Sequence, residues 1–481
     1  MNREFTKTLV LTMAGSLAVY GQGRPLDWPN LGGDAQRSGW EKVDTRITRD
    51  NVKDFQLVMK RKLGNGPLTP PAIIGLLISY RGFKELAFVA GGGSNEMWAI
   101  DADLDRVFWS KHFDGAAASG ACGATAASPA LIPPTNFAAR RPPGGPRPTV
   151  PPAAASSPAR PTGRGILGAG GFGAPRPVFG VSGDGKLHLM NTSTGDDVVP
   201  AIPFLPPNAS RTYLTVVDNT VYTVTSPDCS AGSGAVWALD LNNETAKAVS
   251  YPLKGGPVSG FAMGTNGAVY VQTSEALLAL SPKVLKLQQS FASGAPASKA
   301  ASPVVFAYKG RDVIATAGEG GRVYLLDSKS LGGDDHKTPL AQSDPVGSGE
   351  ITGGLSTWLD GGTRWLLAPV WGSSHGSIVA FKVEDKDGKT VLTKAWESGE
   401  MNGPEPAVIT AGVVFALASG AQNSGHATLY AFDGTTGKQI YSTGDQVTAP
   451  ASLNGVTLAN GRVFFSTTDG TLYAFGIYLE R

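Results

Sequence analysis

The segment that decides the fold is Leu429-Tyr430-Ala431-Phe432-Asp433-Gly434-Thr435-Thr436-Gly437-Lys438. It begins with a short apolar run typical of a strand and ends in a Gly-containing turn. Its first five positions read aliphatic, aromatic or bulky, Ala or Leu, large apolar, and often Asp. This pattern occurs eight times, with copies that begin at residues 97, 187, 236, 277, 323, 378, 429 and 472. One repeated unit therefore organises the sequence.

The spacing of the copies indicates the architecture. Successive copies lie roughly 40 to 55 residues apart, except for a first gap of 90. That period, with strand patterns and no sustained 3.6-residue apolar period, is typical of four-stranded propeller blades. Asp184-Gly185 and Asp469-Gly470 are hairpin signals, because Gly accepts the positive φ of tight turns. The sequence predicts an all-β, eight-bladed propeller of four-stranded antiparallel blades, with seven blades as the alternative.

The ends of the repeat array predict how the ring closes. The chain stops soon after the eighth copy, so the last blade lacks an outermost strand, which residues 55–63 would supply. The long first gap contains residues 133–177, with 12 Pro, six Arg and no acidic residue. Such a composition buries too little apolar surface to offset its ordering entropy. We expect a lead-in over residues 22–54, a propeller over 55–481 and a disordered insert over 133–177.

The N-terminus has the order of a secretory signal. Arg3 and Lys7 precede an apolar run of about a dozen residues and the small residue Gly21. The run is too short to span a bilayer, and no Cys follows it to carry a lipid. With 41 basic and 39 acidic residues, no strong field would attract nucleic acid. We expect a signal peptide over residues 1–21, a periplasmic or secreted protein, no transmembrane segment and no nucleic-acid partner.

The chain has two cysteines, Cys122 and Cys229. In the predicted propeller both lie in loops on the same face of neighbouring blades, and an oxidising compartment would allow them to pair. The sequence therefore predicts a Cys122–Cys229 disulfide, with two separate buried thiols as the alternative.

The repeat resembles that of the pyrroloquinoline-quinone (PQQ) propeller family, part of the quinoprotein alcohol dehydrogenase-like superfamily. Residues 429–438 match it almost position for position, and residues 28–34 and 47–53 resemble the lead-in of the quinoprotein dehydrogenases. The family includes these dehydrogenases and a non-catalytic assembly propeller of the outer-membrane protein insertion machinery. The resemblance also implies that Trp109, Trp396 and Tyr441 pack one blade against the next.

Departures from the catalytic members shape the functional hypothesis. The dehydrogenases carry two adjacent cysteines that form a ring over the quinone, whereas Cys122 has Ala121 and Gly123 beside it. Their calcium ligands and catalytic Asp pair have no matching motif, so no catalytic residue or metal ligand is assigned. We expect an exported module that binds a protein or small-molecule ligand on its top face or in its channel. The alternative is a divergent PQQ- and calcium-dependent dehydrogenase of an alcohol or sugar.

Three residues are the candidates for a binding site on the top face. His375 and His426 occupy the same hairpin position in consecutive blades, and imidazole can bind metals or transfer protons. Trp371 lies in the blade of His375 and offers a ring on which a planar cofactor would stack. The plainer interpretation makes the histidines solvated turn residues and Trp371 a packing residue. His112, His188 and His336 suggest no site.

Overall fold

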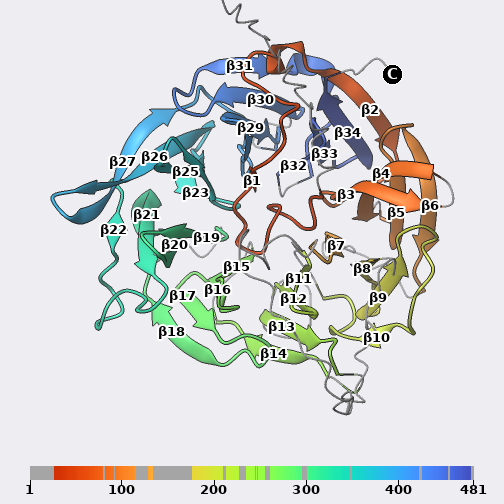
Figure 1. The fold of residues 1–481 in the computed structure, drawn as a ribbon, viewed down its shortest axis with the longest axis horizontal. Coiled ribbons are helices and arrows are strands. Elements are labelled where there is room, and N and C mark those ends of the chain that lie inside the picture. Colours follow the sequence, from red (N-terminus) through yellow and green to blue (C-terminus); the bar gives the residue numbers. More distant parts are fainter. Residues whose placement is uncertain are drawn as a thin grey trace, which may run out of the picture.

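A computed structural model of the chain describes most of the sequence and forms a closed ring of β-sheets around a central axis (Figure 1). The described residues are 27–79, 82–91, 93–114, 128–133, 176–209, 213–226, 234–243, 245, 247–254, 260–294, 301–346, 349–421, 425–452 and 455–477. The predicted signal peptide, both cysteines and residues 134–175 of the predicted insert lie outside them. Among the described residues no helix is long and apolar enough to cross a membrane.

Eight antiparallel blades make up the ring, each with its first strand nearest the axis. Blades 1 to 4 comprise β3 (Ala72–Ser79), β4 (Gly82–Gly91), β5 (Glu96–Asp101) and β6 (Arg106–His112); β7 (Ala130–Leu131), β8 (Pro177–Val181), β9 (Lys186–Asn191) and β10 (Ile202–Pro203); β11 (Thr215–Val217), β12 (Thr220–Thr225), β13 (Ala235–Asp240) and β14 (Val249–Pro252); and β15 (Phe261–Met263), β16 (Val269–Gln272), β17 (Leu277–Leu280) and β18 (Leu287–Phe291).

Blades 5 to 8 complete the ring, and two of their sheets gain a short fifth strand. They comprise β19 (Val304–Tyr308), β20 (Arg311–Gly318), β21 (Arg322–Asp327) and β22 (Ala341–Gln342); β24 (Ser356–Asp360), β25 (Thr363–Trp371), β26 (Gly376–Lys386) and β27 (Lys389–Glu397), with β23 (Glu350–Ile351); β28 (Val408–Thr410), β29 (Val413–Ala418), β30 (Thr428–Asp433) and β31 (Gln439–Ser442), with β1 (Trp40–Glu41); and β32 (Thr457–Ala459), β33 (Arg462–Ser466), β34 (Thr471–Gly476) and β2 (Gln56–Lys62).

The eight motif copies coincide with the third strand of every blade, from β5 to β34. The third strand has a neighbouring strand on both sides and sheet packing on both faces, so its residues are largely buried. The repeated apolar pattern reflects this burial of the third strand on both faces. The predicted fold class and the count of eight blades are confirmed, and the seven-bladed alternative is wrong.

Ring closure also follows the prediction. The strand β2 pairs antiparallel with β34, from Gln56 opposite Gly476 to Lys62 opposite Thr471. The first long strand of the chain thus completes the last blade, and β34 is left with no open edge.

The lead-in forms a second closure, at the centre of the ring. Residues 28–44, which we call the hub segment, run through the centre of the ring (Figure 1) and contact the eight blades in chain order, the first seven on their first strands and blade 8 at the β32–β33 turn. The contacts are Trp28 N to Ile73 O (2.9 Å), Leu131 N to Pro29 O (2.8 Å), Asn30 Nδ2 to Thr215 Oγ1 (3.5 Å), Met263 N to Ala35 O (2.8 Å), Val305 N to Gln36 O (3.0 Å), Thr357 N to Ser38 O (2.8 Å), Ile409 N to Gly39 O (2.7 Å) and Gly461 N to Asp44 Oδ2 (2.6 Å).

Aromatic residues of the fourth strands join neighbouring blades, as the family resemblance implies. The indole Nε1 of Trp109 donates to Thr192 O (3.0 Å), and that of Trp396 donates to Gly434 O (2.8 Å), each in the next blade. A Cβ at Gly437, whose φ is 72°, would approach the Trp396 ring to 2.7 Å, so the turn requires glycine there. The Tyr441 ring meets Phe55, just before β2, with centroids 5.9 Å apart. The three expected blade-to-blade contacts are confirmed.

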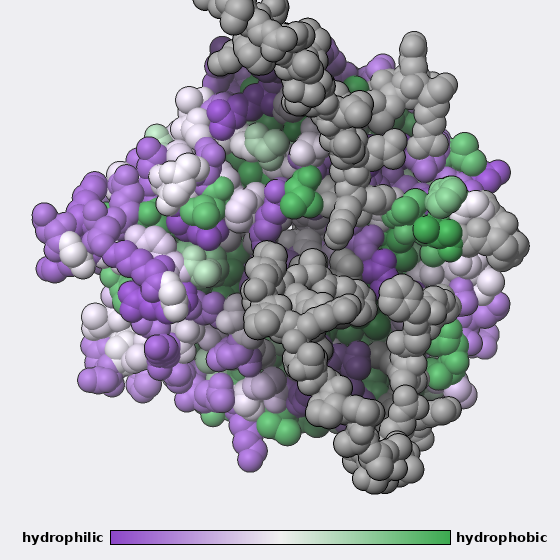
Figure 2. Space-filling model, viewed as in Figure 1, coloured by the Kyte–Doolittle hydropathy of each residue, from purple (hydrophilic) through white to green (hydrophobic). Residues whose placement is uncertain are grey.

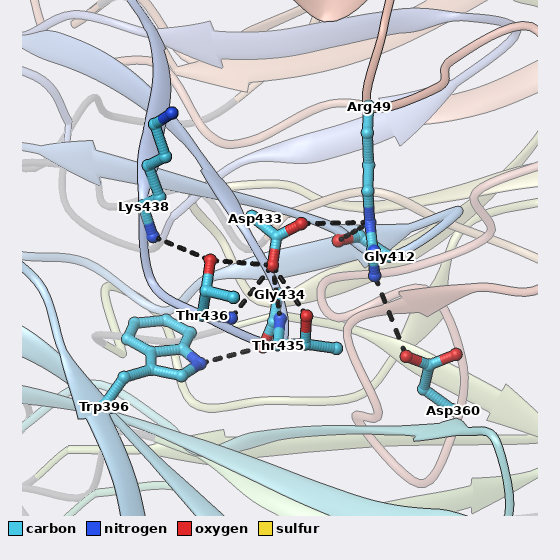
Figure 3. A network of polar contacts seen from close by, with 9 residues as sticks. All are labelled: Arg49, Asp360, Trp396, Gly412, Asp433, Gly434, Thr435, Thr436 and Lys438. Carbon is cyan, nitrogen blue, oxygen red and sulfur yellow. Dashed lines mark hydrogen bonds and ion pairs between the residues drawn. The ribbon is translucent and has the colours of Figure 1, made fainter.

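Arg49, just after the hub segment, holds the turns of blades 6 and 7 together (Figure 3). Its guanidinium lies 3.2 Å from Asp433 and 3.8 Å from Asp360. The Asp433 carboxylate also accepts hydrogen bonds from the backbone N–H groups of Thr435 (3.0 Å) and Thr436 (2.9 Å). Burial pushes the pKa of Asp433 upward, but these hydrogen bonds and the Arg49 charge outweigh it and hold the pKa below its usual range.

Candidate functional site

The two ends of the ring carry different turns. We call the side where second strands end and third strands begin the upper face, and the opposite side the lower face. The hairpin between β25 and β26 contains His375, and the hairpin between β29 and β30 contains His426. Both candidate histidines therefore lie on the upper face, in neighbouring blades 6 and 7. We call the upper face of these two blades, with the β25–β26 and β29–β30 hairpins, the upper rim.

Each candidate histidine has its own carboxylate partner. His375 Nδ1 lies 3.8 Å from Glu400 Oε2, and His426 Nε2 lies 3.0 Å from Asp445 Oδ1. All four side chains are substantially exposed, from 40% for His426 to 94% for Asp445. The structure thus pairs each histidine with an acid and gives the two histidines no shared partner. Such exposed pairs contribute little to stability and are available to a ligand.

An open, polar pocket of about 360 Å³ surrounds His375. Its walls come from the β25–β26 hairpin, from the end of β27 and from the approach to β23. Glu397 on one wall accepts hydrogen bonds from Ser377 (2.7 Å) and Lys394 (2.7 Å). Burial raises the pKa of Glu397, but these two bonds outweigh it and the pKa lies below its usual range. The lining residues are Val346, Gly349, Val370, Gly372, Ser373, Ser374, His375, Gly376, Ser377, Glu397, Ser398 and Glu400.

Trp371 ends β25 beside this pocket and is half-buried. Its indole Nε1 donates to Pro404 O at 2.6 Å, and a Cβ at Gly403 would lie 3.3 Å from its ring. The ring thus packs on the loop that leads into blade 7. Trp358 and Trp365, at the lower end of the same blade, are buried and stack with centroids 5.2 Å apart.

One grouping was not predicted from the sequence. His188 Nε2 lies 3.1 Å from Ser182 Oγ, and His188 Nδ1 lies 3.1 Å from Asp197 Oδ2, which is the order of a nucleophilic triad. Ser182 is only 1% exposed, however, and its hydroxyl also contacts Asp184 in its own turn. Thr467 makes the same turn contact with Asp469 in blade 8, where no histidine is present. The shared turn shows that Ser182 caps its hairpin.

The described residues do not fit PQQ with calcium. No group of three or more His, Cys, Asp or Glu converges on a metal position within the described part of the chain. PQQ is a tricarboxylate, whereas the upper-rim pocket presents the carboxylates of Glu397 and Glu400. The negative charges of these carboxylates and of PQQ repel each other and oppose its binding in this pocket. We therefore derive no chemical step through PQQ, and the predicted Cys122–Cys229 pair lies outside the described residues.

Comparison with known proteins supports the repeat assignment. Residues 374–477 match the family described as outer membrane protein assembly factor BamB. That segment includes β26 and β27 of blade 6, β28 to β31 of blade 7 and β32 to β34 of blade 8, and therefore both candidate histidines and Glu400. No curated protein sequence matches the chain.

Similar solved structures share the fold of the whole ring. The quinohemoprotein alcohol dehydrogenase from Comamonas testosteroni superposes with a TM-score of 0.56 at 14% identity, over 95% of this chain and 81% of that one. The quinohemoprotein alcohol dehydrogenase ADHIIG from Pseudomonas putida HK5 gives 0.56 at 11% identity, over 94% and 80%. A europium-containing methanol dehydrogenase gives 0.53 at 11% identity, over 94% and 98%. The predicted repeat is therefore confirmed by sequence over residues 374–477, and the similar structures confirm the propeller fold of the ring.

Proposed function

We propose that the chain is a binding module that holds a protein partner at the upper rim of blades 6 and 7. The observation that carries the proposal is the open polar pocket of about 360 Å³, in which His375 and Glu400 face each other with exposed side chains. Exposed polar groups around a concavity are suited to reversible recognition of a polar ligand. The match to an assembly-factor family covers this same segment and supports a binding role.

The centre of the ring supports the same proposal. The hub segment takes up space near the axis, and Trp28, Asn30 and Arg37 within it are nearly fully buried. The chain thus supplies its own residues to the first strands of seven blades and to the β32–β33 turn of blade 8. A partner would then meet the rims of the blades rather than their centre. Residues 1–21 would direct the protein to the periplasm or the cell exterior, where such a partner would be met.

The lower face offers a contrast in surface chemistry. Figure 2 shows hydrophilic surface over the long β26–β27 hairpin and apolar surface over blade 1. The apolar residues there are Leu76, Ile78 and Phe83 of the β3–β4 hairpin, with Ile78 and Phe83 directly opposite each other. Ile78 is 69% exposed and Phe83 is 71% exposed. A lower-face contact is therefore a competing binding mode that the experiment has to distinguish.

Site-specific photo-crosslinking tests the proposal. A photoreactive phenylalanine analogue at Ser373, in the upper-rim pocket, should give a defined adduct in cells, and Lys438 on the lower face is the matched exposed position. The substitutions His375→Ala and Glu400→Gln should reduce the Ser373 adduct. Adducts from Lys438 alone, or from neither position, would contradict an upper-rim partner.

A separate measurement tests the oxidoreductase alternative, for which the described residues offer no supporting donor set. Purified protein is incubated with PQQ and calcium, and dye reduction is followed with an alcohol and with a sugar. We expect no dye reduction above the protein-free reaction. PQQ-dependent turnover would replace the binding-module proposal.

A further inference from the structure

An unusual charge lies at the centre of the ring. Arg37 of the hub segment is only 6% exposed. Its Nη1 donates to Ser302 Oγ at 3.0 Å, and its guanidinium carbon lies 4.5 Å from the centroid of the Tyr213 ring. Gly260 and Gly354 flank the guanidinium closely enough that a Cβ on Gly260 would come within 2.6 Å of Nη1. Residues from blades 3, 4, 5 and 6 therefore surround one buried cation.

No described carboxylate forms an ion pair with this cation; its contacts are the Ser302 hydroxyl and the Tyr213 ring. Residues 255–259, 295–300 and 347–348, which precede the first strands of blades 4, 5 and 6 in the sequence, include no Asp or Glu. Burying an ionised group costs several kcal/mol unless an opposite charge or a full set of hydrogen bonds compensates it. One hydroxyl and one ring face offset only part of that cost. Among the residues that the structure describes, this site therefore lacks an anion.

A small cavity lies next to Arg37. It has a volume of about 20 Å³, and Arg37 and Ser356 both line it, together with apolar residues such as Leu355 and Val408. Ser356 is 2% exposed, and its hydroxyl oxygen has no hydrogen-bond partner. A cavity of this size holds about one water-sized particle. Arg37, whose charge has no ion-pair partner among the described residues, and Ser356, whose hydroxyl has no hydrogen-bond partner, thus line the same cavity.

We propose that this cavity binds a monatomic anion, chloride under ordinary conditions, between Arg37 and the Ser356 hydroxyl. A halide supplies the missing negative charge and accepts the unused hydroxyl hydrogen. The volume excludes phosphate, sulfate and carboxylate ligands, which are several times larger. Because the hub segment contacts every blade, the anion would stabilise the whole ring.

Thermal unfolding of the full chain tests the proposal. The midpoint is measured in mixtures of sodium chloride and sodium gluconate at constant ionic strength, since gluconate is too large for the cavity. Above the dissociation constant, each tenfold rise in chloride should raise the midpoint by about 1.5 °C for a protein of this size. Equal midpoints in chloride and gluconate would overturn the proposal, because a general salt effect would act in both.

Two variants and one direct observation sharpen the test. Arg37→Gln should abolish the chloride dependence, and Ser356→Ala should weaken apparent chloride affinity several-fold. The matched control is Arg364→Gln, because Arg364 is also buried but lies at the lower end of blade 6 against Phe306 and Trp40 and does not line the cavity, so the chloride dependence of this variant should persist. If Arg37→Gln does not fold, a crystal grown in sodium bromide decides: an anomalous peak beside the guanidinium supports the site, and a featureless cavity contradicts it.

Discussion

Blades 6 and 7 present two different ends. At the lower end, Trp396 contacts the turn of the next blade, and Arg49 links Asp433 to Asp360 across the blade boundary (Figure 3). At the upper end, His375 and His426 each meet one exposed carboxylate, and an open pocket lies beside them. The same two blades thus use their lower turns for packing and leave their upper turns to solvent.

The difference has a physical origin in the repeat. A turn that must receive the indole of the preceding blade needs glycine at a fixed place, and its Asp must bond the turn N–H groups. These demands recur at the lower end and account for the Asp, Thr and Gly of the motif. The upper hairpins of blades 2 and 8 share a Ser/Thr-x-Asp-Gly turn, whereas those of blades 6 and 7 carry His375 and His426 at the corresponding position. Functional residues are therefore expected at the end of a blade where the repeat is weakest.

The largest expected effect comes from comparing two tryptophans of blade 6, one that packs against a lower turn and one at the upper end. Trp396→Ala removes a buried indole and its bond to Gly434, and should cost about 3 to 5 kcal/mol of unfolding free energy. Trp371→Ala, at the upper end of the same blade, removes a half-buried ring and should cost less than about 2 kcal/mol. Denaturant unfolding of both variants measures the two losses. Equal losses would remove the asymmetry between the ends.

A second effect concerns pH at another lower-end boundary, between blades 8 and 1. Burial raises the pKa of Glu85 to about 7, although Arg462 lies 3.2 Å away and favours the charged form. The folded protein then binds this proton more tightly than the unfolded chain does. The contribution of Glu85 to the free energy of unfolding should therefore be greatest below about pH 4.5. It should fall, by at most roughly 3 kcal/mol, as the pH rises toward 7.

Glu85→Gln is the control for this pH effect. The amide has no proton to lose in this range, so the decline of stability between about pH 4.5 and 7 should become shallower in the variant. The measurement is the denaturant midpoint at several pH values for both proteins. An identical pH profile for the two would assign the decline to other groups.

A smaller effect is expected at the carboxylates. Asp433→Asn weakens the turn bonds and removes the charge opposite Arg49, and should cost about 1 to 2 kcal/mol. Asp445→Asn, on the upper end of the same blade, should cost less than about 0.5 kcal/mol because Asp445 is almost fully exposed. Equilibrium unfolding of the pair gives the comparison. A larger loss for Asp445→Asn would show that the upper end also holds the ring.

The smallest effect on stability belongs to the proposed binding residues. His375→Ala and Glu400→Gln should each change the free energy of unfolding by less than about 0.5 kcal/mol, since both side chains are exposed. The same variants should lose the Ser373 crosslink. Retention of the crosslink at full yield would separate the pocket from partner recognition.

The sequence predicted the ring well because each third strand meets the same environment. The copies beginning at Leu429 and Leu472 form β30 and β34. The strand predicted over residues 55–63 is β2, which pairs with the outer edge of β34 in blade 8. Side-chain periodicity reports burial, and burial repeats from blade to blade. That is the part of a fold that a single sequence expresses most clearly.

The centre of the ring could not be predicted in the same way. The hub segment bonds mostly through backbone groups, such as Ala35 O and Gln36 O, which leave no side-chain pattern in the sequence. The contact between Ser182 and His188 has another origin, the Ser-x-Asp turn of its hairpin, which aligns with the Thr467-x-Asp469 turn of blade 8. The upper-rim positions of His375 and His426 were predicted, but their carboxylate partners come from loops without a repeat.

The closure of blade 8 sets the order in which the molecule can be completed. β2 is translated well before its partner β34, which lies about 400 residues later in the chain. Contacts of such long sequence separation form slowly, because the entropy cost of closing a large loop precedes any stabilising hydrogen bond. β2 therefore has no partner strand until β34 has been synthesised. Translation that stopped before residue 471 would leave β2 without its partner strand.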